Sequence, residues 1–121
     1  MSLTTPHRFD RIVVSTTAAS VASGVAGVIN APCRGKIVEV GTNIGSVVST
    51  ADATVTTSIA GTAITGGSFT IAYTSSAIGD HDSASPTAVN TCTEGQLIKF
   101  AFTGSGTAGG HVYCYANIVP D

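Results

Sequence analysis

The stretch 53-ATVTTSIAGTAITGGSFTIAYT-74 decides the fold class. Over its last seven residues, Phe69, Ile71 and Tyr73 alternate with small or polar side chains. A period of two places the three large residues on one face of a strand, as a half-buried antiparallel sheet requires. We therefore predict a strand over residues 68–74, with Tyr73 among the residues that face the core.

The rest of this stretch reads as two further strands. Residues 53–59 form the first and residues 62–64 a short second one. Gly66 and Gly67 can adopt the positive φ angles of a tight turn, so we expect a turn to separate the short strand from residues 68–74.

The same alternation recurs outside this stretch. It predicts strands over residues 10–17, 25–30, 36–44, 96–103 and 111–119. In strand 36–44 we expect Val38, Val40 and Ile44 to face the core, with a bulge or a close backbone approach at Gly41. The inward sets of the last two strands are Ile98, Phe100 and Phe102, and then Val112, Cys114, Ala116 and Ile118.

About eight short strands and no convincing helix predict an all-β fold. We expect a single antiparallel β-sandwich of the jelly-roll kind over residues 10–121, with a closed barrel as the alternative. Residues 1–9 contain Pro6 and show no periodicity, so we interpret them as an N-terminal arm. Residues 75–93 are the longest stretch without a regular pattern, and we expect a loop there.

Charge is scarce in this chain. Only 10% of the 121 residues are charged, against roughly 25% in an average soluble domain. Such a surface suits contacts with identical copies or a larger partner, although a Thr- and Ser-rich β protein can stay soluble without them. A net charge of −2 with no basic stripe argues against nucleic acid as a partner. No window has the roughly 18 apolar residues of a membrane span.

Candidate chemistry is sparse. Asp80, His81 and Asp82 form the densest group of titratable residues, and two carboxylates could ligate Ca²⁺, but a solvated loop tip explains them as well. No G-x-S-x-G motif marks a nucleophile. Cys33, Cys92 and Cys114 are odd in number and widely spaced, which favours free, buried thiols over a disulfide framework or a zinc site. We expect no catalytic residue, metal, cofactor or small-molecule substrate.

Four segments carry a resemblance to a known family. They are 31-APCRGKIVEV-40, 51-ADA-53, 61-GTAITGG-67 and 79-GDHDSASPT-87. Together they resemble the small β-sandwich head decoration (cement) proteins of tailed bacteriophages, whose related domains occur in phage fibres. The resemblance implies a non-enzymatic virion protein, assembled in the host cytoplasm. It would sit as a homotrimer on the outer capsid surface and bridge subunits of the major capsid protein.

Within this interpretation we expect the partner contacts to come from two places. One is the arm, with Arg8 and Arg11, and the other is the loop that holds Asp80, His81 and Asp82. The alternative function is a receptor- or glycan-binding domain of a phage fibre or spike, which would need exposed aromatic residues. Tyr113 and Tyr115 share the outward face of the last strand, where they could stack on a sugar or a partner subunit or simply pack across strands.

Overall fold

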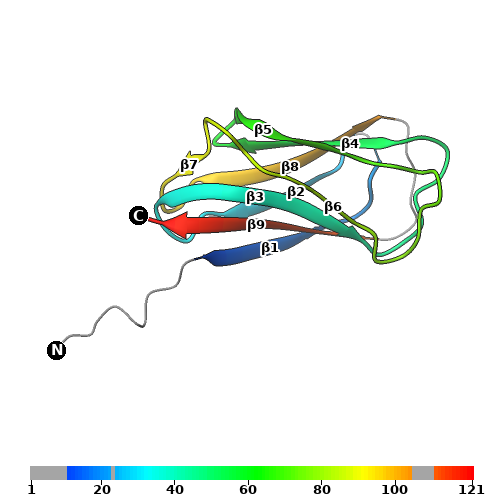
Figure 1. The fold of residues 1–121 in the computed structure, drawn as a ribbon, viewed down its shortest axis with the longest axis horizontal. Coiled ribbons are helices and arrows are strands. Elements are labelled where there is room, and N and C mark those ends of the chain that lie inside the picture. Colours follow the sequence, from blue (N-terminus) through cyan, green and yellow to red (C-terminus); the bar gives the residue numbers. More distant parts are fainter. Residues whose placement is uncertain (1–10, 23, 105–110) are drawn as a thin grey trace.

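The computed structural model describes residues 11–22, 24–104 and 111–121. These residues form nine strands and no helix (Figure 1). The strands are β1 (Ile12–Ala18), β2 (Ala26–Asn30), β3 (Gly35–Ile44), β4 (Ala53–Ile59), β5 (Thr62–Ile71), β6 (His81–Ala84), β7 (Thr91–Cys92), β8 (Leu97–Gly104) and β9 (Val112–Pro120).

The strands lie in two sheets that pack face to face (Figure 1). One has the order β1-β9-β3-β6, with β7 also paired to β3, and the other has the order β2-β8-β4-β5. Every pairing is antiparallel. Leaving out the two-residue β7, the first strand pairs with the last, the second with the next to last, and so on inward to β4 and β5. A long hairpin rolled up into two layers has this order, so the predicted jelly-roll sandwich is confirmed.

The core lies between β8 and β9, which occupy inner positions of their sheets. The predicted inward residues of both strands are almost completely buried, including Phe100 and Phe102 of β8. They form one hydrophobic cluster with inward residues of β3, β4 and β5. Cys92 and Cys114 are buried in it as free thiols, while Cys33 is half-buried at its border.

The predicted turn at Gly66 and Gly67 is wrong. β5 continues through both glycines, and its pairing with β4 jumps from Thr56↔Ser68 to Ser58↔Ala63. Residues 64–67 therefore form a large bulge, in which four residues of β5 lie opposite Thr57 of β4. Two backbone groups of the bulge have partners outside β5: the Thr65 N–H donates to the Ala88 carbonyl (3.0 Å), and the Gly67 carbonyl accepts from the Thr57 hydroxyl (2.7 Å).

Residues 75–93 are more regular than predicted. They contain β6, which pairs with Val40–Asn43 of β3, and β7, which pairs with Gly35 and Lys36. β6 is an edge strand of only four residues. Its local sequence has no apolar alternation, so β6 can be identified only from its pairing with β3.

Two residues predicted to face the core, Tyr73 and Val38, are not buried in it. Tyr73 is 46% exposed, because β5 ends at Ile71 and Tyr73 lies beyond the sheet. In β3 the register shifts between Ile37 and Glu39, so Ile37 is fully buried in the core and Val38 is only half-buried. Gly41 does mark a close approach, since the ring of Tyr115 covers it.

We expect the hydrogen bond at the β5 bulge to contribute measurably to stability. Thr57→Val keeps the side-chain shape but removes the buried donor to the Gly67 carbonyl, which costs about 1–3 kcal/mol of unfolding free energy. The matched control is Thr56→Val on the exposed side of the same strand, with a change within about 0.5 kcal/mol. Denaturant unfolding measures both, and equal midpoints would contradict this role of Thr57.

Candidate functional site

The residues predicted to make partner contacts are not brought together. Arg8 and the arm lie outside the described residues. Arg11 is exposed and directly precedes β1, whose first residue pairs with Ile118. His81 instead pairs with Asn43, which pairs with Tyr113 near the other end of β9. Arg11 and the Asp80–Asp82 segment are therefore at opposite ends of the sandwich.

Asp80, His81 and Asp82 also separate from one another. Asp80 lies in the loop before β6, where its Oδ2 accepts a hydrogen bond from the Ala77 N–H (2.9 Å). Strand alternation then turns His81 outward and Asp82 toward the space between the sheets, where it is half-buried. This burial, and secondly the charge of Asp80, raise the pKa of Asp82, while the nearby His81 lowers it.

A hydrogen-bonded network crosses the outward face of the first sheet. The Tyr115 hydroxyl of β9 donates to Glu39 Oε2 of β3 (2.9 Å), and Asn117 Nδ2 donates to Glu39 Oε1 (2.8 Å). His81 Nε2 of β6 lies 2.5 Å from the same hydroxyl. Because the hydroxyl proton goes to Glu39, the His81 ring must donate its Nε2–H to the tyrosine oxygen. The network ties three strands together.

Tyr115 is held flat against the sheet. It pairs with Gly41, and a methyl group built on Gly41 would lie 2.5 Å from Tyr115 Cζ, so the ring fills the space that a side chain would take. Burial, then the hydrogen bond to Glu39 and the charge of that carboxylate, raise the pKa of Tyr115 from 10.0 to about 12. The hydroxyl therefore stays protonated and remains a donor at physiological pH.

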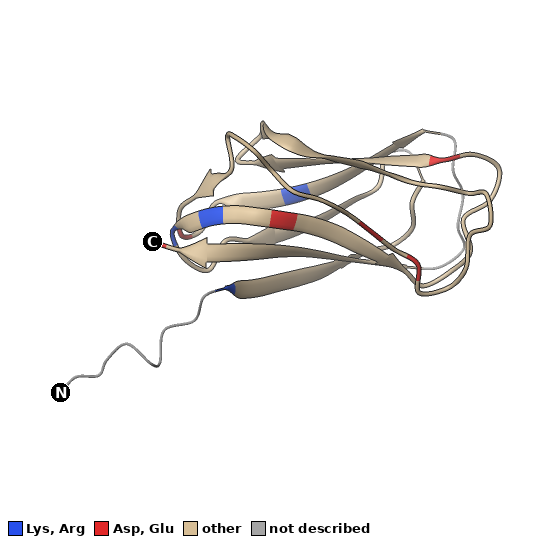
Figure 2. Ribbon diagram, in the orientation of Figure 1, with Lys and Arg blue, Asp and Glu red and all other residues tan. Residues whose placement is uncertain are grey.

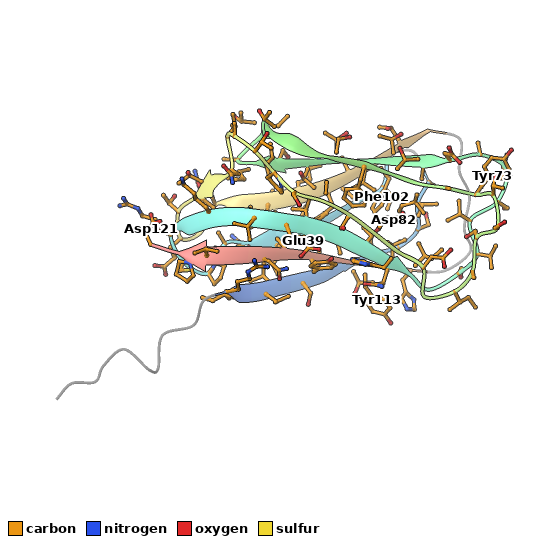
Figure 3. The ribbon with its side chains drawn as sticks, viewed as in Figure 1. Glu39, Tyr73, Asp82, Phe102, Tyr113 and Asp121 are labelled. Atoms are coloured by element: carbon orange, nitrogen blue, oxygen red, sulfur yellow. The ribbon has the colours of Figure 1, made fainter. Side chains whose placement is uncertain are left out.

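A second aromatic pair lies two residues before Tyr115. Tyr113 is 50% exposed, and its hydroxyl lies 2.8 Å from His111 Nε2, with the two rings nearly perpendicular. We call the outward residues Glu39, His81, Tyr113, Tyr115 and Asn117 the tyrosine face. Figure 3 shows Glu39 and Tyr113 on this sheet.

Sequence analysis identified the two tyrosines but missed Glu39 and Asn117 as their partners. The outward positions of Glu39 and Asn117 follow from strand alternation alone. Their meeting depends on the register Glu39↔Asn117 between β3 and β9, which lie far apart in the sequence.

A second candidate surface is formed by two loops, residues 45–52 and 72–80, which we call the end loops. Two hydrogen bonds join them, Val48 N–H to Ser76 Oγ (2.9 Å) and Tyr73 N–H to Asp52 Oδ1 (3.1 Å). The Gly79 N–H also donates to the carbonyl of Ile44, the last residue of β3 (2.8 Å). Figure 3 places Tyr73 at this end of the sandwich and Asp121 at the other. The loops are therefore cross-linked into one surface.

Large apolar side chains project from the end loops. Val47 is 49% exposed, Tyr73 46% and Ile78 72%. Charge is sparse over the described part of the chain (Figure 2), and within the end loops Asp52 and Asp80 each accept a hydrogen bond from a backbone N–H. These exposed apolar side chains make the end loops a candidate interaction surface.

Cys92 and Cys114 are poor nucleophiles. Burial raises the pKa of Cys114 to about 12, and burial followed by the neighbouring Cys33 raises that of Cys92. Among the described residues, no group of three or more His, Cys, Asp or Glu side chains is placed to hold a metal ion. In the same part of the chain, no helix is long and apolar enough to span a membrane.

Comparison with known proteins bears on the fold. No protein-family model and no curated protein sequence matches this chain. Among solved structures, it is similar to CsCBM6-3 from Clostridium stercorarium, a structure in complex with cellobiose. The match has a TM-score of 0.50 and 13% sequence identity, and it covers 93% of this chain and 82% of the other. At this identity the likeness supports the β-sandwich fold alone.

We expect the inward-facing Asp82 to lower stability at neutral pH. Its raised pKa means that folding favours the neutral form, so stability falls as the pH rises through the folded-state pKa. Asp82→Asn should therefore raise the melting temperature at pH 7. The gain should vanish below pH 3.8, where the carboxyl is protonated in both states.

Thermal unfolding of both proteins across this pH range measures the effect. Glu94→Gln, at an exposed carboxylate, is the matched control. A lower melting temperature for Asp82→Asn at pH 7, or a difference that does not change with pH, would contradict the prediction.

Proposed function

We propose that this chain is a capsid decoration protein that binds the outer surface of a phage head and bridges subunits of the major capsid protein. Three features support the proposal: the sequence resemblance to head decoration proteins, the sparse charge, and a β-sandwich whose end loops expose large apolar side chains. Such a protein needs no catalytic centre. By binding the assembled lattice and not the separated subunits, it shifts the equilibrium toward the assembled head.

The end loops are the observation that carries this proposal. Val47, Tyr73 and Ile78 offer apolar surface, and Asp52 and Asp80 are turned to the backbone of the loops. Because hydrogen bonds already hold both loops in place, binding orders little additional chain, which reduces the entropic cost of association. We propose that this end of the sandwich contacts the capsid.

A charge placed on the end loops should weaken capsid binding. Ile78→Asp puts a carboxylate on the most exposed of the three apolar residues, and burying it without a partner should weaken binding at least about tenfold. Val28→Asp is the matched control, since Val28 is 47% exposed on β2 and pairs with Lys99 of β8. Co-sedimentation with phage heads that lack the protein measures both. Equal binding of the two variants would remove the end loops from the proposal.

We also propose that the decoration unit is a homotrimer. Size-exclusion chromatography with light scattering should then give a mass near three times the 12.0 kDa of one chain. A mass of one chain at all accessible concentrations would contradict a trimer in solution.

A second function, glycan binding by a fibre or spike domain, is favoured by the tyrosine face. Its aromatic rings lie beside a carboxylate and an amide on an open sheet, a combination that suits sugars. The similar structure was solved with cellobiose, which makes a neutral glycan a reasonable first probe. Selective binding on a glycan array would favour this function, and saturable binding to empty heads would favour decoration.

A further inference from the structure

The hydrogen bond between Tyr115 and His81 joins two rings into one plate. Their centroids are 5.7 Å apart and their planes differ by 27°. The two rings are thus nearly parallel, and they meet where the tyrosine hydroxyl contacts the imidazole nitrogen. The Tyr115 ring covers Gly41 on the outward side of the sheet, where Tyr115 is half-buried and His81 is exposed. The result is a flat aromatic surface on the sheet.

Hydrogen-bonding groups border this plate on one side. The Glu39 carboxylate receives one hydrogen bond on each oxygen, from Tyr115 and Asn117, and a carboxylate has about four acceptor sites in all. The Asn117 amide can both donate and accept, and one of its two N–H groups is used on Glu39. Donors and acceptors are thus offered side by side next to an apolar surface.

An aromatic surface bordered by a carboxylate and an amide favours one class of ligand. The Glu39 charge disfavours an anion. Cations are typically recognised in cages of several rings set around them, whereas rings tilted by only 27° form an open surface. A pyranose has an apolar ring face to place on the plate and hydroxyl groups that both donate and accept. Tyr113, about 7 Å along β9 by strand geometry, can contact the next sugar unit.

We propose that the tyrosine face is a binding site for a neutral oligosaccharide. The Tyr115–His81 plate stacks on one sugar ring, and Glu39 and Asn117 hydrogen-bond its hydroxyl groups. This inference rests on the second function proposed above and names its site and ligand class. It does not depend on capsid binding, because the end loops lie at one end of the sandwich and the plate lies on the face of a sheet.

NMR titration of the ¹⁵N-labelled protein tests the site. The probes are cellobiose, maltose and lactose at millimolar concentrations, where weak binding is measurable. At least one should shift the amide resonances of Gly41, His81 and Asn117, which lie under or beside the plate. Tyr115→Ala should weaken that binding about tenfold, and Tyr115→Phe, which keeps the ring, should weaken it less. Tyr73→Ala removes a tyrosine that is 46% exposed in the end loops and should leave the affinity for the sugar unchanged.

The possible outcomes distinguish an error in the proposed site, the tyrosine face, from an error in the proposed function, glycan binding. If a sugar shifts resonances of residues 72–80 and Tyr73→Ala removes the effect, the chain binds glycans but the proposed site is wrong. If none of the three sugars shifts any resonance, both the site and the glycan-binding function are overturned. Unchanged affinity in a folded Tyr115→Ala variant, with dispersed amide resonances, also overturns the site.

Discussion

The burial of alternate residues of β8 and β9 between the two sheets is the constraint on which the rest of the structure depends. Phe100 and Phe102 on one side, and Val112 and Ile118 on the other, belong to one hydrophobic cluster. Because strand side chains alternate, burying them forces Tyr113, Tyr115 and Asn117 onto the outer surface. The tyrosine face is thus a consequence of how the core packs.

Backbone hydrogen bonding explains how the less regular segments are held. The bulge of β5 would expose unpaired groups, but Thr57 and Ala88 satisfy them. β6 protects an edge of the first sheet by being short and by turning Asp82 inward, devices that discourage pairing with another chain. The inward carboxylate carries a cost in stability, visible in the raised pKa of Asp82.

The two candidate surfaces differ in chemistry and place. The end loops expose the apolar side chains of Val47, Tyr73 and Ile78, while Asp52, Ser76 and Asp80 accept hydrogen bonds from backbone N–H groups. The tyrosine face is polar and aromatic, and its network leaves capacity for further hydrogen bonds. The two surfaces adjoin, because His81 of the tyrosine face directly follows Asp80 of the end loops.

Strand periodicity predicted much of this structure. The inward sets of β8 and β9, Cys114 among them, follow from alternation alone, whereas the burial of Cys92 was expected from the odd number and wide spacing of the cysteines; both predictions are confirmed. Alternation failed where a strand ended or bulged: Tyr73 lies beyond β5, and Ile37 takes the place expected for Val38. β6 was missed because its four residues carry no apolar pattern.

Strand periodicity predicted only part of the candidate site. Tyr113 and Tyr115 could be identified as outward residues of one strand, but their partners could not. Glu39 and His81 come from strands that are distant in the sequence, and pairing registers bring them to Tyr115. No local pattern encodes such a register.

The sequence by itself determined the fold class, the inward face of the central strands and the scarcity of charge, because these follow from composition and from a period of two within single strands. Only the tertiary structure decided the strand order, the bulge at Gly66 and Gly67, the bracing of the end loops and the meeting of His81, Tyr115 and Glu39. Each of these depends on contacts between residues far apart in the chain, which form when the rolled hairpin closes around its core.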